Sequence, residues 1–137
     1  MFGRFHRHVS KLLHHLAPAQ PPLARHRASA ALRPPLLHPN GDRFLDSGLV
    51  VTTEFVTNAV LHGTPVGHLI YFALDVDPTR LRIEVHDARG DCLPAFSSPG
   101  LDGETGRGLH LVDSLTKRWG CCPRRPVGKI VWGEVAA

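Results

Sequence analysis

The chain has 137 residues, of which 42% are hydrophobic, and this suits one domain with a single core. The excess of basic over acidic residues lies entirely in residues 1–38, which hold six basic side chains and no acidic one. Residues 39–137 are slightly acidic, so the charge pattern argues against direct binding of nucleic acid by the main domain, and no apolar run is long enough to span a membrane.

Residues 1–38 are expected to form a basic, proline-interrupted segment that is distinct from the rest of the chain. Apolar residues recur at helical spacing over residues 2–16 and basic residues fill the opposite face, which predicts an amphipathic helix. Such a helix can pack on the domain, on a second subunit or on a membrane surface, and a disordered leader is the remaining alternative. Residues 17–23 are expected to be a linker, and a short helix over residues 23–33 is expected to end at the prolines that follow.

The three cysteines do not form a complete disulfide framework, and their spacing is not that of a zinc site. Nothing in the chain resembles a secretory signal with a small-residue cleavage site. We therefore expect reduced thiols and a cytoplasmic protein.

Residues 39–137 are expected to form the main domain. Their hydrophobic periodicity and turn residues predict, in order, a helix over 44–62, a strand over 69–74, a turn at 77–79, a strand over 81–87, a loop over 88–105, a helix over 108–117 and a strand over 127–135. Asp46 or Ser47 is the expected cap of the first helix. This order favours an α/β (α+β) two-layer sandwich, in which helices cover one face of a mixed, mostly antiparallel sheet.

The first of these helices carries Glu54 and Asn58, four positions apart and therefore on the same face. Apolar neighbours such as Phe55 and Val56 indicate that the rest of the helix is largely buried. An acid and an amide held together in this way can coordinate a hard cation and orient a nucleophile. A solvated helix edge is the alternative interpretation of the same pair.

Two later elements carry further polar signals. Asp87 ends an alternating strand, where it is either a ligand-binding carboxylate or the start of an Asx-turn. Gly106 and Gly108 open the next helix, and glycines at a helix N-terminus let the backbone N–H groups approach a phosphate. A plain turn is the alternative for this glycine pair.

The order of these motifs resembles the ATP-binding domains of sensor histidine kinases, DNA gyrase and the MutL repair protein. The resemblance is strongest to the small bacterial anti-sigma-factor serine/threonine kinases, and it covers about residues 44–134. The segments that carry it are Glu54-Phe55-Val56-Thr57-Asn58-Ala59-Val60-Leu61-His62, Val85-His86-Asp87, Gly106-Arg107-Gly108-Leu109-His110-Leu111-Val112-Asp113, Arg118-Trp119-Gly120 and Gly128-Lys129-Ile130-Val131-Trp132.

This resemblance implies a Bergerat-type ATP-binding fold with ATP and Mg²⁺ as cofactors. It implies that Asp87 accepts a hydrogen bond from the exocyclic amine of adenine and that Asn58 is a Mg²⁺ ligand. It implies that Glu54 is the general base that activates a serine hydroxyl on a partner protein. The cofactor-binding residues that it implies are Asn58, Asp87, Gly90, Gly106, Gly108 and Leu109.

The implied partners are an anti-sigma-factor antagonist and a sigma factor, and the family's habit of dimerising makes a homodimer a further expectation. Two positions depart from the family pattern. Gly90 follows Asp87 one place late, and Ile130 stands where a threonine helps to hold the water that bridges to adenine; that loss would weaken ATP binding about tenfold. Two alternatives therefore stay open: a nucleotide-binding regulator without catalysis, and an interaction module that has lost its nucleotide.

Overall fold

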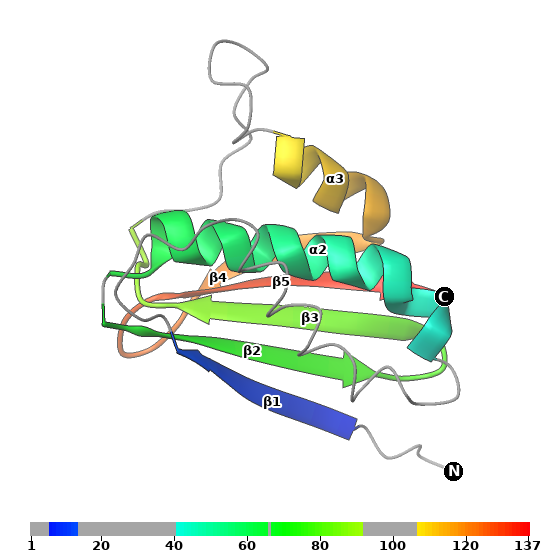
Figure 1. Ribbon diagram of the computed structural model, residues 1–137, viewed down its shortest axis with the longest axis horizontal. Helices are drawn as coiled ribbons and strands as arrows, with labels where there is room; N and C mark the ends of the chain where they lie inside the picture. Colours follow the sequence, from blue (N-terminus) through cyan, green and yellow to red (C-terminus); the bar gives the residue numbers. More distant parts are fainter. Residues whose placement is uncertain (1–5, 14–40, 66, 92–106) are drawn as a thin grey trace.

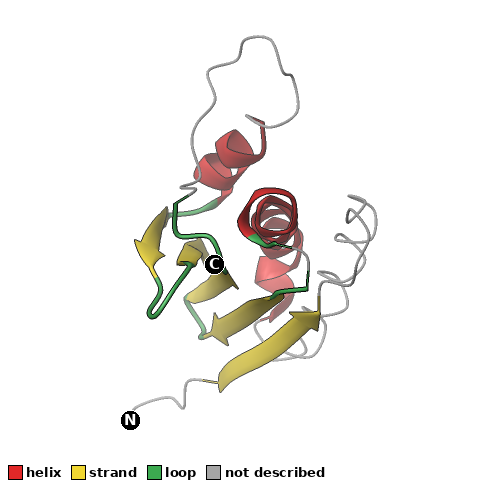
Figure 2. Ribbon diagram, turned by 90° about the vertical axis from the view of Figure 1, so that its left-hand side faces the viewer, coloured by secondary structure: helices red, strands yellow, loops and turns green. Residues whose placement is uncertain are grey.

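The computed structural model describes residues 6–13, 41–65, 67–91 and 107–137. These residues form one antiparallel sheet with the strand order β1-β2-β3-β5-β4 and two α-helices (Figure 1). Both helices lie on the same side of the sheet (Figure 2), which confirms the α+β class and the placement of the helices on one face. The elements are β1 (His6–Leu13), a 3₁₀ turn η1 (Gly41–Phe44), α2 (Leu45–Asn58), a π-helical turn η2 (Ala59–Gly63), β2 (Leu69–Val76), β3 (Arg80–Asp87), α3 (Arg107–Leu115), β4 (Arg118–Pro123) and β5 (Lys129–Ala136).

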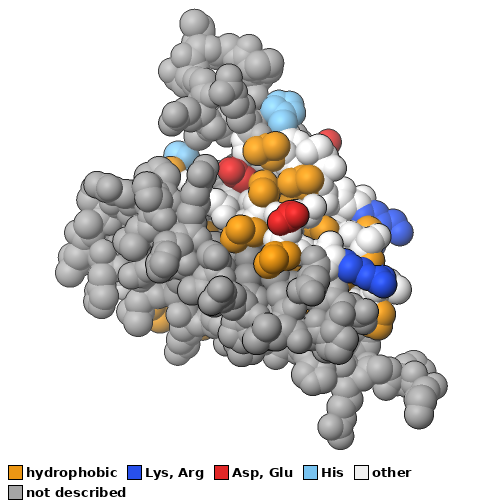
Figure 3. Space-filling model, turned by 45° about the vertical axis from the view of Figure 1, so that its right-hand side comes forward, with side chains coloured by type: hydrophobic (Ala, Val, Ile, Leu, Met, Phe, Trp, Pro, Cys, Tyr) orange, Lys and Arg blue, Asp and Glu red, His pale blue; other side chains and the backbone are white. Residues whose placement is uncertain are grey.

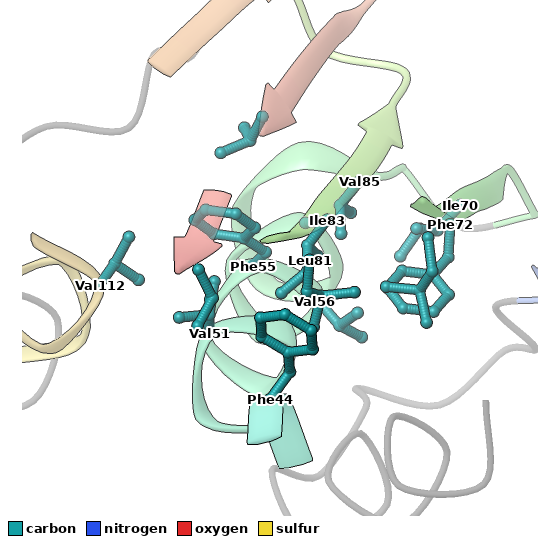
Figure 4. Packing of buried hydrophobic residues seen from close by; sticks show 14 of the residues in the cluster. Phe44, Val51, Phe55, Val56, Ile70, Phe72, Leu81, Ile83, Val85 and Val112 are labelled. Carbon is teal, nitrogen blue, oxygen red and sulfur yellow. The ribbon is translucent and has the colours of Figure 1, made fainter. Parts of the chain in front are cut away.

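Helix α2 packs on β3 and β5 because one of its faces is apolar. Phe55 of α2 and Phe44 of the preceding η1 turn are almost fully buried there, and each such side chain contributes about 1.5–3 kcal/mol by leaving water. The opposing strand alternates as expected, with its apolar side chains facing the helix and its polar ones facing away. Figure 4 shows this core, whose labelled members are Phe44, Val51, Phe55, Val56, Ile70, Phe72, Leu81, Ile83, Val85 and Val112.

The hairpin expected from the alternating strands is confirmed by the pairing of β2 with β3. Asp77 closes the turn between them, since its Oδ1 accepts hydrogen bonds from the Thr79 backbone N–H at 2.7 Å and the Arg80 backbone N–H at 3.0 Å. The turn fixes the register of the hairpin. Alternation along β3 places Asp87 on the same face as the apolar residues of that strand.

The structure corrects two of the sequence predictions and adds one strand. The amphipathic helix expected over residues 2–16 is wrong, because His6–Leu13 is a strand that pairs along its whole length with β2. The edge of β2 offers unpaired N–H and C=O groups, and pairing them outweighs the helical spacing of the apolar residues.

Neither Asp46 nor Ser47 caps α2, because η1 brings the chain into the helix and Phe44 occupies the N-cap. Strand β4 was not predicted; the short helix expected over residues 23–33 lies outside the described residues.

Among the described residues, no helix is long and apolar enough to cross a membrane.

The sheet face that points away from the helices carries a buried carboxylate surrounded by arginines. Glu134 is 4% exposed and accepts hydrogen bonds from Arg80 at 2.6 Å, Arg82 at 3.0 Å and Arg118 at 2.6 Å. The Arg82 guanidinium also stacks 4.5 Å from the centre of the Trp132 ring. The Arg118 hydrogen bond, together with those from the other arginines, lowers the pKa of the Glu134 carboxyl.

Glu134 should therefore make stability depend on pH in the acid range. A carboxyl whose pKa is lowered by folding stabilises the protein above its unfolded value of 4.5, and this contribution is lost as the pH falls through the folded value. We expect Glu134→Gln to cost about 2 kcal/mol near neutral pH, because charged hydrogen bonds are lost while the arginines remain partly solvated. Urea unfolding at about pH 7 and about pH 3 measures this difference. A cost that is equal at both pH values would contradict the assignment.

Candidate functional site

Asp87 ends β3 on the face that is covered by the helices and is only 1% exposed. Its Oδ1 accepts a hydrogen bond from the Arg89 backbone N–H at 3.0 Å, so the Asx-turn allowed by the sequence is present. The Lys129 ammonium also contacts this carboxylate, at 3.1 Å from Oδ1 and 2.8 Å from Oδ2. Burial raises the pKa of the Asp87 carboxyl, and the Lys129 ammonium opposes that rise.

The end of the helix that carries Glu54 and Asn58 docks directly on Asp87. The carbonyl oxygen of Gly63 accepts hydrogen bonds from the backbone N–H groups of Ala88 at 3.2 Å and Arg89 at 3.0 Å. A Cβ at position 63 would overlap with the Asp87 carboxylate, so the close approach requires a glycine. Gly63, which follows the helix predicted over 44–62, thus forms one wall beside Asp87.

Glu54 meets the start of the next helix. Gly108 is buried in the first turn of α3, and a Cβ there would overlap with the Oε2 atom of Glu54. The carboxylate of Glu54 thus lies against the N-terminal end of α3, where helix N–H groups and the helix dipole favour negative charge. Such an end also suits a phosphate, and Glu54 would then lie next to it.

Asn58 is the last residue of α2 and is half-buried, one turn beyond Glu54. The chain continues as the π-helical turn η2, in which the wider winding changes the faces that the following side chains occupy. π-Helical turns are frequent at functional sites. A sequence pattern with a period of 3.6 residues does not reveal this change of winding.

Gly90 lies in the exposed turn after β3, against the turn that precedes β5. A Cβ at position 90 would lie 3.0 Å from the Gly128 carbonyl oxygen, and Gly128 has a positive φ of 105°. The glycine that follows Asp87 one place late therefore serves the close packing of two turns. The Arg89 side chain pairs with Asp91 at 3.0 Å.

The predicted site residues form two contact groups along α2. Asp87 lies with the glycine-rich turns at one end of the sheet, and Glu54 lies with Gly108 further along the helix. Leu109 is 2% exposed, so its side chain belongs to the core and only its backbone can face a ligand. In the sequence Asn58 lies between Glu54 and Gly63, the residues through which α2 and its extension contact the two groups. Gly106 lies outside the described residues.

The role inferred from position 130 needs correction. Ile130 pairs with His86 on the sheet face away from the helices, so its lack of a hydroxyl has no bearing on the surroundings of Asp87. The residue directly opposite Asp87 is Lys129. The sequence alone does not reveal this pairing, because it does not fix the register of β5 against β3. Strand alternation back from Trp132 is a weak signal for it.

No protein-family model matches the chain, and a search of curated proteins finds no match. The functional interpretation therefore depends on the order of the motifs and on the contacts between them.

Proposed function

We propose that the chain is an ATP-binding regulatory protein and a serine/threonine kinase of the anti-sigma-factor type. One observation carries the proposal: a single helix, α2 with its π-helical extension, contacts a buried strand-end carboxylate at Gly63 and the start of a second helix at Glu54. The proposed base-recognising carboxylate and the proposed phosphate-binding helix end therefore both contact the same helix.

The spacing of the two contact groups suits a nucleoside triphosphate. Glu54 and Gly63 are nine residues apart, which corresponds to roughly 13 Å along a helix. An extended ATP molecule has a comparable length between its base and its terminal phosphate. In this arrangement the adenine amine faces Asp87 and the γ-phosphate faces the Gly108 end of α3.

In this arrangement Asn58 and Glu54 have different chemical roles. Asn58 would supply an amide oxygen to Mg²⁺, a hard cation that needs few protein ligands. When bound there, Mg²⁺ would supply charge neutralisation for the phosphates. Glu54 accepts the proton of the attacking serine hydroxyl on a partner protein, for which an anti-sigma-factor antagonist is the proposed substrate.

Thermal unfolding with added nucleotide tests ATP binding directly. A ligand at about 100 times its dissociation constant stabilises the folded chain by roughly 2.7 kcal/mol, so ATP with Mg²⁺ should raise Tm. ATP with a chelator should raise it less, because Asn58 contributes through the metal. GTP at the same concentration serves as the control, since it carries a carbonyl where adenine carries the amine. An unchanged Tm at millimolar ATP would refute nucleotide binding.

A second candidate is a nucleotide-binding regulator that sequesters a partner without catalysis. It is favoured by the nearly complete burial of Asp87, which a base reaches only after neighbouring groups move. The helix layer also exposes Leu45 and Leu111 to 43% and 45%, and Figure 3 shows hydrophobic side chains beside acidic ones on the face that it views. Transfer of labelled phosphate from ATP to a captured partner protein separates the two candidates.

A further inference from the structure

Lys129 is a buried ammonium group that contacts three oxygen atoms. It is 5% exposed, and an ammonium has three N–H donors. Three acceptors surround it: Asp87 Oδ2 at 2.8 Å, Asp87 Oδ1 at 3.1 Å and the Arg89 carbonyl oxygen at 2.9 Å. The side chain thus joins the start of β5 to the end of β3 and to the turn that follows it.

We infer that Lys129 is a positioning residue that holds the Asp87 carboxylate in the orientation needed to recognise the amino group of a 6-aminopurine nucleotide. This inference rests on the proposed function, because it concerns the same site. Contacts to both carboxylate oxygens prevent the group from rotating, and the positive charge favours its ionised, hydrogen-bond-accepting form.

The acceptor capacity of Asp87 agrees with this role. An ionised carboxylate offers about four lone-pair sites. Lys129 and the Arg89 backbone N–H use three of them, two on Oδ1 and one on Oδ2. The remaining site is on Oδ2, the oxygen that a side chain at position 63 would overlap. One acceptor is therefore left beside Gly63 for a ligand N–H group, which reaches it once the groups that bury Asp87 move.

The charges around Asp87 predict what happens when Lys129 is removed. Lys129 on β5 and Arg124 in the preceding turn favour the ionised form, and the Cys121 thiol on β4 is a further titratable group in the electrostatic surroundings of Asp87. Without Lys129, burial still raises the pKa of Asp87, and the groups that remain to lower it are the Arg89 backbone N–H and Arg124. Adenine binding should then weaken as the pH falls, which a purely structural role would not produce.

Calorimetric titration of ATP and inosine triphosphate tests the inference. Inosine carries a carbonyl in place of the amino group, so it gains nothing from an oriented carboxylate. We expect Lys129→Met to weaken ATP binding about tenfold, with a larger loss at about pH 6 than at about pH 8, and to leave inosine triphosphate binding nearly unchanged. Lys117→Met, which removes an exposed lysine before β4, should change neither affinity.

Three results would overturn the inference. An equal loss of affinity for both nucleotides would mean that Lys129 only supports the fold. If Lys129→Met does not fold, Lys129→Gln keeps N–H donors but lacks the charge, so the preference for ATP over inosine triphosphate should fall more at about pH 6 than at about pH 8; a preference with the same value at both pH values would be equally negative. Failure of the unmodified protein to bind ATP would instead refute the proposed function, and the role of Lys129 with it.

Discussion

Replacing Glu54 by Gln should lower the rate of phosphoryl transfer by about 10²–10⁴-fold, because the carboxylate that accepts the serine proton is lost. ATP affinity should stay close to that of the unmodified protein, since Gln keeps the size of the side chain that lies against Gly108. Transfer of labelled phosphate to the captured partner measures the rate, and calorimetric titration measures the affinity. A fall in the rate without a fall in affinity is the signature of a group that acts in the transition state.

Asp46 provides a matched control on the same helix. It is an exposed carboxylate in the first turn of α2, two turns before Glu54. Asp46→Asn removes the same charge as Glu54→Gln and should leave transfer unchanged. If Glu54→Gln transfers phosphate at the unmodified rate, Glu54 is not the base. If neither protein transfers phosphate but both bind ATP, the non-catalytic regulator is the better description.

The elements that the sequence predicted are those whose pattern is local. Helix α2 and the β2–β3 hairpin have clear periodicity because each places one face against the core. β4 escaped prediction because it is an edge strand in which half-buried residues predominate, so its sequence shows no alternation of apolar and polar side chains. β1 was mistaken for a helix because its pairing partner is more than fifty residues away in the sequence.

The residues of the candidate site also differ in whether a local sequence pattern could predict them. Glu54 and Asp87 were predictable because each has a fixed position within one regular element. Gly63 and Lys129 were not, because their contacts with Asp87 depend on a π-helical turn and on the register between β3 and β5. Both features are set by packing between elements, and a local pattern of hydrophobicity carries no record of them.

Gly128→Ala should be the most damaging small substitution near the site. The residue has a φ of 105°, a conformation that side chains disfavour, and a Cβ there would overlap with the backbone carbonyl oxygen of Asp87. A backbone atom in a paired strand cannot swing aside as a flexible side chain can. We therefore expect a loss of about 3 kcal/mol or more in the free energy of unfolding, measured in urea.

Gly67 separates the two causes of this loss. It also has a positive φ, of 85°, but a Cβ there meets no atom within 4 Å. Gly67→Ala carries only the conformational strain and should cost about 1–2 kcal/mol. The difference between the two variants then measures the overlap with Asp87. Equal costs would mean that the turn before β5 moves without a measurable loss of stability. The close approach of Gly128 to the Asp87 backbone would then not be rigid enough to orient the Asp87 carboxylate.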